Sequence, residues 1–161
     1  MHINPDHYLQ TAEGRVTTPE RNAWAWQQCH AALERALAIA GPRSRLYLMV
    51  GAQGSGKSTW ARRAIADDPD AIAFDAILVK RAEREPLLVQ ARRFGVPAVA
   101  VWCRTPLALC LERNAARPPD EVADEQGLRN VFAALEPPSI AEGFIRVVEL
   151  SPGAGRAEEA A

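Results

Sequence analysis

Short apolar runs alternate with amphipathic stretches along most of the chain. Apolar runs without polar alternation predict buried strands over 45–50, 71–74, 96–102 and 144–150. The intervening stretches predict helices over about 56–66, 84–94, 106–116 and 124–135. Repeated strand, loop and helix units of this kind predict an α/β fold, a three-layer sandwich with a central parallel sheet of about five strands.

A further helix is predicted before the first of these strands. Residues 1–18 are polar and rich in turn formers, and Thr17 or Thr18 then caps a helix with Pro19 in its first turn. Gly41-Pro42 ends this helix near residue 40. Its apolar positions recur at intervals of three and four and predict one buried stripe: Ala23, Trp26, Cys29, Leu33, Leu37 and Ala40.

Composition and charge narrow the functional classes. The chain has 161 residues, 48% of them hydrophobic and 24% charged, which favours one domain over residues 1–150, followed by a flexible tail over 151–161. The net charge of −1 gives no general attraction to nucleic acid or anionic membranes. Three irregularly spaced cysteines favour a reducing compartment, and no apolar stretch is long enough to span a membrane. We therefore expect a cytoplasmic protein without a membrane segment.

A glycine-rich loop directly follows the strand over 45–50 and precedes a predicted helix. Gly51, Gly56, Lys57 and Ser58 satisfy the spacing G-x-x-x-x-G-K-[ST]. Glycines let the backbone wrap phosphates, and the loop amides together with the helix N-terminus offer N–H donors to them. Lys57 is expected to reach the β and γ phosphates, and the Ser58 hydroxyl to ligate Mg²⁺.

This loop predicts ATP binding. The alternative is a glycine-rich turn with an incidental lysine, but the strand before the loop and the helix after it favour a nucleotide site. ATP is favoured over GTP because the chain has no Asn-Lys-x-Asp sequence to read guanine. The predicted nucleotide-binding residues of the loop are Gly51, Gln53, Gly54, Ser55, Gly56, Lys57, Ser58 and Thr59.

Several segments after residue 46 carry a family resemblance, most strongly at the glycine loop. The others lie at 74–84, 111–117, 136–139 and 142–144. The chain resembles P-loop kinases of the polynucleotide 5′-kinase type, a group that includes zeta-toxin-like and AAA-type ATP-binding domains. This resemblance implies a P-loop NTPase fold that transfers the γ-phosphoryl group to a hydroxyl of a nucleic-acid end or a small molecule. It also implies that Asp75 binds Mg²⁺ or the acceptor, and that Arg113 and Arg117 belong to a lid over the nucleotide.

The order of segments departs from that family. Such kinases place a strand, an acceptor-side Asp and a helix after the glycine-loop helix, where this chain has only residues 67–70. The N-terminal segment 1–44 looks like that missing element, moved ahead of the core and lid over 45–150 as in a circular permutation. By this resemblance Asp6 faces the γ-phosphate, and Asp6 or Asp75 accepts the proton of the acceptor hydroxyl as general base. Leu9 stands where the family commonly has an Arg, so a 3′-phosphorylated polynucleotide acceptor would lack that contact.

The candidate site residues also have structural interpretations. Asp6 is compatible with a turn after Asn4-Pro5, and Asp75 with a cap at the end of its strand. Arg113 and Arg117, four residues apart, are expected on one helix face, which could be either the lid surface or a solvated face. The corresponding functional alternatives are an ATP-binding or hydrolysing switch module that acts through a partner, and a nucleotide binder without turnover.

Two further groups of side chains leave alternatives open. Lys80, Arg81 and Arg84 form a local basic group that either holds an anionic acceptor or solvates a helix start. Trp24 and Trp26 lie two residues apart and cannot share one helix face, so we expect one to pack and the other to be free for contacts.

Overall fold

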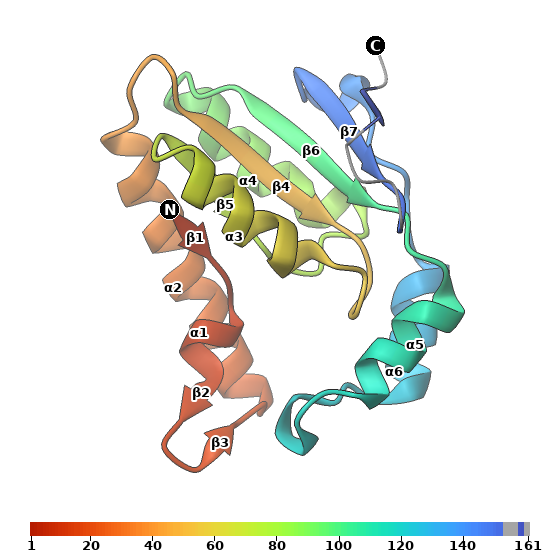
Figure 1. The fold of residues 1–161 in the computed structure, drawn as a ribbon. Helices are drawn as coiled ribbons and strands as arrows, with labels where there is room; N and C mark the ends of the chain where they lie inside the picture. The colour runs from red at the N-terminus through yellow and green to blue at the C-terminus, as the bar shows by residue number, and fades with distance from the viewer. Residues whose placement is uncertain (153–157, 160–161) are drawn as a thin grey trace.

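The central sheet has six strands in the order β1-β5-β4-β6-β7-β8 (Figure 1). A computed structural model describes residues 1–152 and 158–159 of the chain. Five strands run parallel to their neighbours, and the short β8 pairs antiparallel with β7. The strands are β1 (His2–Ile3), β4 (Arg45–Val50), β5 (Ala71–Phe74), β6 (Ala98–Cys103), β7 (Arg146–Leu150) and β8 (Glu158–Glu159). The predicted parallel sheet of an α/β fold is confirmed.

Helices cover both faces of this sheet. On one face lie α2 (Pro19–Ala38) and α4 (Arg81–Arg93), and on the other lies α3 (Lys57–Asp67). Two more helices, α5 (Leu107–Ala115) and α6 (Glu125–Ala133), lie beyond the carboxyl end of β6 (Figure 1). The short elements are α1 (Asp6–Leu9), the hairpin β2 (Gln10–Thr11) and β3 (Gly14–Arg15), and the 3₁₀ turns η1 (Pro119–Glu121) and η2 (Ile140–Glu142). Within the described ranges, none of the helices combines the length and apolar character that crossing a membrane requires.

The strands are buried on both faces, which explains their lack of polar alternation. Leu46, Leu48 and Phe74 pack toward α2 and α4, whereas Met49 and Val101 pack toward α3. Each face of the sheet therefore has its own apolar layer, as expected for a parallel sheet with helices on both sides.

The first long helix begins as predicted and ends earlier than predicted. The Thr18 hydroxyl accepts a hydrogen bond from Arg21 N at 3.2 Å, and the helix stops at Ala38. Its buried face runs through Ala25 and not Ala23, which is exposed. Trp26 packs against the core, while Trp24 is 44% exposed and contacts the Tyr8 ring and the Arg21 guanidinium. One tryptophan therefore packs and the other lies in a surface contact, as expected. The buried residues of the helix are Ala25, Cys29, Ala32, Leu33, Ala36 and Leu37.

The N-terminal residues contain more structure than a polar, turn-rich segment. Strand β1 lies parallel to β5, and the Ile3 carbonyl accepts a hydrogen bond from Asp75 N at 2.8 Å. The carboxyl ends of β1 and β5 therefore lie at the same edge of the sheet. Two residues of strand are too few for a periodic sequence pattern, so only the tertiary pairing reveals this strand.

The remaining elements differ from prediction mainly at their ends. Helix α4 begins at Arg81, three residues earlier than expected, and the Glu83 carboxylate caps its start by accepting a hydrogen bond from Lys80 N at 2.9 Å. Strand β6 begins after Pro97 because a proline cannot donate to the ladder. The expected flexible tail over 151–161 falls largely outside the described residues. Within it, Glu158 and Glu159 form β8.

Candidate active site

The glycine loop between β4 and α3 has a backbone shape that its glycines make possible. Gly54 and Gly56 adopt positive φ angles of 76° and 100°. A Cβ on Gly54 would lie 2.6 Å from the carbonyl oxygen of Cys110 in α5, so no other residue fits there without a shift. The Thr105 hydroxyl donates to the Ser55 carbonyl at 2.8 Å. The loop is thereby held against the segment that begins α5.

Lys57 is the first residue of α3 and folds back over the loop. Its ammonium donates to the Ala52 carbonyl at 2.7 Å, and the residue is only 8% exposed. Burial lowers the pKa of this lysine, and the charge of Asp75 opposes that shift. A polyphosphate anion bound in the loop would lie close to the Lys57 ammonium and would favour its charged form.

Asp75 directly follows β5 and is 3% exposed. Its Oδ2 accepts a hydrogen bond from Asn4 Nδ2 at 2.9 Å and lies 3.0 Å from His2 Nε2. Burial on its own would raise the pKa of this carboxyl, but hydrogen bonds from His2 and Ser58 and the charge of Lys57 outweigh it and hold the pKa below its usual value. Asp75 is therefore a carboxylate at neutral pH, and it adjoins the Ser58 hydroxyl.

Ser58 and Asp75 fit a magnesium ion. They supply a hydroxyl and a carboxylate oxygen side by side at the carboxyl edge of the sheet, and Mg²⁺ prefers oxygen ligands. The described part of the chain has no cluster of three or more His, Cys, Asp or Glu side chains that could hold a metal. Mg²⁺ needs no such cluster, since it commonly takes one or two protein ligands together with phosphate oxygens and water.

Asn4 joins the two candidate carboxylates. Its Oδ1 accepts a hydrogen bond from the backbone N–H of Asp6 at 2.8 Å, while its Nδ2 donates to Asp75. Asn4 is 8% exposed, so this bridge is shielded from solvent. The Asp6 side chain is 44% exposed and forms an ion pair with Arg15 at 3.1 Å. One amide side chain thus fixes the start of α1, which carries Asp6, against the end of β5.

Arg15 also connects the N-terminal hairpin to the segment after α5. Its guanidinium lies 3.5 Å from Glu121, and its backbone N–H donates to Asp120 Oδ2 at 2.9 Å. The Arg15 side chain is 13% exposed, and its Nε is buried without a hydrogen-bond partner. The hairpin and η1 therefore meet at the rim of the site.

The two predicted lid arginines do not share a helix. Arg113 lies in α5 and donates to the Gly54 carbonyl at 3.3 Å, whereas α5 ends at Ala115 and Arg117 follows it. Pro118 disfavours helical backbone at the residue before it, which explains the early end. Asn114 pins the loop beyond α5, since its amide both donates to and accepts from the backbone of Ala123.

A single cavity of about 700 Å³ brings most of these groups together. Asp75 does not line the cavity itself but contacts two residues that do, His2 and Asn4. Gly51 and Gln53 do not line the cavity, and Gly51 instead packs against Ser55 and Cys103. The predicted site residues that do line it are Asp6, Gly54, Ser55, Gly56, Lys57, Ser58, Thr59, Arg113 and Arg117.

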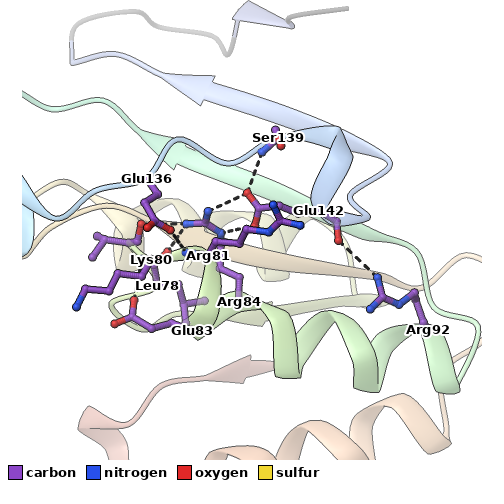
Figure 2. Close-up of polar contacts among 10 residues, drawn as sticks. Leu78, Lys80, Arg81, Glu83, Arg84, Arg92, Glu136, Ser139 and Glu142 are labelled. Atoms are coloured by element: carbon purple, nitrogen blue, oxygen red, sulfur yellow. Dashed lines mark hydrogen bonds and ion pairs between the residues drawn. The ribbon is translucent and has the colours of Figure 1, made fainter.

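The predicted basic group at Lys80, Arg81 and Arg84 is not a unit that could hold an acceptor. Arg84 is fully buried, and its guanidinium pairs with both oxygens of Glu142 at 2.7 and 2.8 Å (Figure 2). It also donates to the carbonyls of Leu78 and Val79. The expectation that Arg84 holds an acceptor or faces solvent is wrong, because its guanidinium donates all of these hydrogen bonds inside the protein. These bonds connect the loop after Asp75 to η2.

Three residues of the site escaped the sequence analysis: His2, Asn4 and Arg15. Asn4 was visible only as part of an Asn-Pro turn, and His2 and Arg15 carry no motif. Their roles depend on pairings across 73, 71 and 105 residues of sequence. All three cysteines are free and buried, consistent with their expected role as small apolar residues.

Residues 62–138 match the model of a family described as an AAA domain. Together with the sheet order and the glycine loop at the end of β4, this match decides the fold. The chain has the P-loop NTPase fold. The match covers slightly under half of the chain and begins after the P-loop, so motif and match are independent observations. No curated protein is a significant match to the sequence.

Proposed function

We propose that this P-loop domain is an ATP-dependent phosphotransferase that moves the γ-phosphoryl group to a hydroxyl of a nucleic-acid end or a small molecule. One observation carries the proposal: the cavity that contains Lys57 and the P-loop also contains Asp6, which arrives from the N-terminal segment. Transfer to a hydroxyl needs a proton acceptor beside the γ-phosphate, and Asp6 brings a carboxylate into this cavity. Asn4 links the backbone of Asp6 to Asp75 and so fixes the two halves of the site against each other.

The residues divide into donor and acceptor roles. Lys57 and the P-loop amides hold the β and γ phosphates, and Arg113 and Arg117 face the charge that develops on the γ-phosphoryl group. Asp6 accepts the proton of the acceptor hydroxyl as the new phosphate ester bond forms, and its ion pair with Arg15 orients the carboxylate. Ser58 and Asp75 would hold Mg²⁺, which neutralises phosphate charge when bound.

The N-terminal position of Asp6 supports a rearranged version of the polynucleotide 5′-kinase type. We infer that segment 1–44 supplies the acceptor half of the site and segment 45–150 the donor half and lid. Strand β1 beside β5 and the Asp6-bearing turn after it suit this arrangement, since ligands of such sheets bind beyond the carboxyl ends of the strands. The same proposal takes residues 1–150 as one domain that works in the cytoplasm.

Transfer of label tests the proposal. The protein is incubated with Mg²⁺ and ATP labelled at the γ-phosphate, together with 5′-hydroxyl oligonucleotides and a panel of small alcohols and sugars. We expect label to appear in at least one acceptor, and Lys57→Ala to abolish the transfer. The matched control is Lys80→Ala, which removes an exposed lysine away from the cavity and should leave transfer unchanged.

The same assay separates the alternatives. A switch module that hydrolyses ATP for a partner would release labelled orthophosphate in every mixture and label no acceptor. A nucleotide binder without turnover would bind ATP in a Lys57-dependent way and release no phosphate. Either result would refute the kinase proposal.

A further inference from the structure

The N-terminal hairpin and the segment after α5 meet at the rim of the cavity. They approach each other from opposite sides of the molecule (Figure 1). Gly14 makes the contact possible, because its φ angle is 113° and a Cβ there would lie only 3.1 Å from Asp120 Oδ2. The next N–H along the hairpin, that of Arg15, donates to the same Asp120 oxygen at 2.9 Å. The hairpin backbone is therefore shaped to receive one carboxylate from η1.

The Arg15 side chain extends this contact to Asp6, the proposed general base. Its guanidinium lies 3.1 Å from the Asp6 carboxylate and 3.5 Å from that of Glu121, and the side chain is only 13% exposed. One cation is thus shared between a carboxylate of α1 and a carboxylate of η1. Because the shared guanidinium attracts both carboxylates, the position of η1 and the position of Asp6 depend on each other.

The other end of the contact leads to Arg117. Pro118 and Pro119 separate Arg117 from Asp120, and their rings fix φ, so the spacer between the two residues is stiff. Arg117 lines the cavity, and its guanidinium has no hydrogen-bond or ion-pair partner among the residues that the structure describes. Its place in the cavity therefore depends on the backbone, which Asn114 holds on one side and Asp120 on the other.

We propose that Asp120 is a positioning residue: its contact with the hairpin holds Arg117 and Asp6 in the cavity together, so that the site is assembled only while this contact is made. The contact of Asp120 with Gly14 and Arg15 is called the hairpin latch below. The proposal rests on the phosphotransfer roles proposed for Arg117 and Asp6. An anion that binds Arg117 stabilises the latch, and a closed latch strengthens the binding of that anion, since such coupling is reciprocal.

A covalent substitute for the hairpin latch tests this coupling without turnover. In Gly14→Cys/Asp120→Cys the two Cβ atoms would lie 3.6 Å apart, within the range of disulfides. The reduced double variant lacks the Asp120 carboxylate, and oxidation with diamide replaces the lost contact by a bond. Gly14→Cys alone is the matched control, because it carries the same strained cysteine at positive φ but keeps Asp120. The three natural cysteines are buried, so oxidation is confined to the introduced thiols.

Calorimetry measures the affinity of the full chain for the Mg²⁺ complex of the β,γ-imido analogue of ATP in both redox states. We expect the oxidised double variant to bind the analogue about fivefold tighter or more than the reduced one, as for typical couplings between sites. Arg117→Ala in the same background should abolish this difference. Equal affinities in the two redox states, or a difference that survives Arg117→Ala, would overturn the hairpin latch. Failure of the two thiols to oxidise would overturn it as well, because the contact would then be absent in solution.

Single-turnover transfer to the acceptor found in the labelling assay tests the link to Asp6. Asp120→Ala should slow this transfer about tenfold or more, whereas Asp120→Asn, whose amide oxygen can still accept from Arg15, should retain most of the rate. Oxidation of the double variant should restore the rate lost in its reduced form, which a merely structural contact would not do. Equal rates in the two redox states would refute the link. If the affinity depends on the hairpin latch but no acceptor is labelled from ATP, the latch stands and the phosphotransfer proposal fails.

Discussion

The buried ion pair between Arg84 and Glu142 gives a sharp prediction about stability. Both side chains are almost entirely removed from solvent, with exposed fractions of 0% and 4%. Two hydrogen bonds of 2.7 and 2.8 Å join them, and Nη1 of Arg84 donates to two backbone carbonyls (Figure 2). Replacing Arg84 by Met keeps much of the apolar volume but leaves the Glu142 carboxylate and both carbonyls without this partner.

The cost of this substitution follows from the burial of the pair. Removing one member of a buried ion pair costs about 3–5 kcal/mol, because the remaining charge stays desolvated without compensation. For a domain of this size each 1 kcal/mol lowers Tm by about 2–4 °C, so we expect Arg84→Met to lower it by about 6–20 °C. The double variant Arg84→Met/Glu142→Met removes the stranded carboxylate and should be more stable than Arg84→Met by at least about 1 kcal/mol.

Urea denaturation followed by circular dichroism measures the free energy of unfolding of these variants. Arg81→Met is the matched control, because Arg81 is an exposed arginine at the start of the same helix, and its effect should stay within about 0.5 kcal/mol. If Arg84→Met were no less stable than Arg81→Met, or if it raised the KM for an acceptor without loss of stability, Arg84 would belong to the acceptor site and the structural interpretation would be refuted.

Three further predictions concern the metal site and the cysteines. The pKa of Asp75 is depressed in the folded state, so its stabilising effect is present above its unfolded value of 3.8 and is lost as the pH falls through the lower folded value. The free energy of unfolding of the wild type should therefore exceed that of Asp75→Asn by less and less as the pH falls below 3.8. A difference that grows at lower pH would contradict the lowered pKa. His2→Ala should raise the Mg²⁺ concentration for half-maximal activity about tenfold or more, with partial recovery in His2→Gln, because His2 contacts the Asp75 carboxylate that we propose as a magnesium ligand. An unchanged Mg²⁺ dependence would speak against this role. Burial raises the thiol pKa values of Cys29 and Cys103 to about 12 and about 11 and also raises that of Cys110, so a disulfide reagent at pH 8 should react slowly with native protein and fast in urea.

The sequence predicted those parts of the fold that arise from local patterns. The apolar runs at β4, β5, β6 and β7 and the cap at Thr18 were recognisable because burial on two faces and N-terminal capping leave local signatures. Strand β1 was not recognisable, since its two residues become a strand only by pairing with β5, 71 residues away in sequence. Helix ends shifted by a few residues where a proline or a capping hydrogen bond decided the boundary.

The residues of the candidate site likewise fall into those that a local pattern predicts and those that only tertiary contacts reveal. The P-loop residues and the end of β5 were predictable from spacing and strand position, because the chemistry of phosphate binding constrains consecutive residues. Asn4 and Arg15 act through partners distant in sequence, so no local pattern identifies them. The burial of Arg84 was not predictable, because a charged residue at a helix start normally faces solvent, whereas here Glu142 makes complete burial possible.

The acceptor-side role of Asp6 is the central claim, and single-turnover transfer measures it most directly. Enzyme in excess over ATP labelled at the γ-phosphate is mixed with the acceptor found in the labelling assay, and the rate of transfer is compared between wild type and Asp6→Asn. We expect this rate to fall about a hundredfold or more, the usual contribution of a general base, with unchanged affinity for ATP. Transfer by Asp6→Asn at a rate close to that of wild type would contradict it.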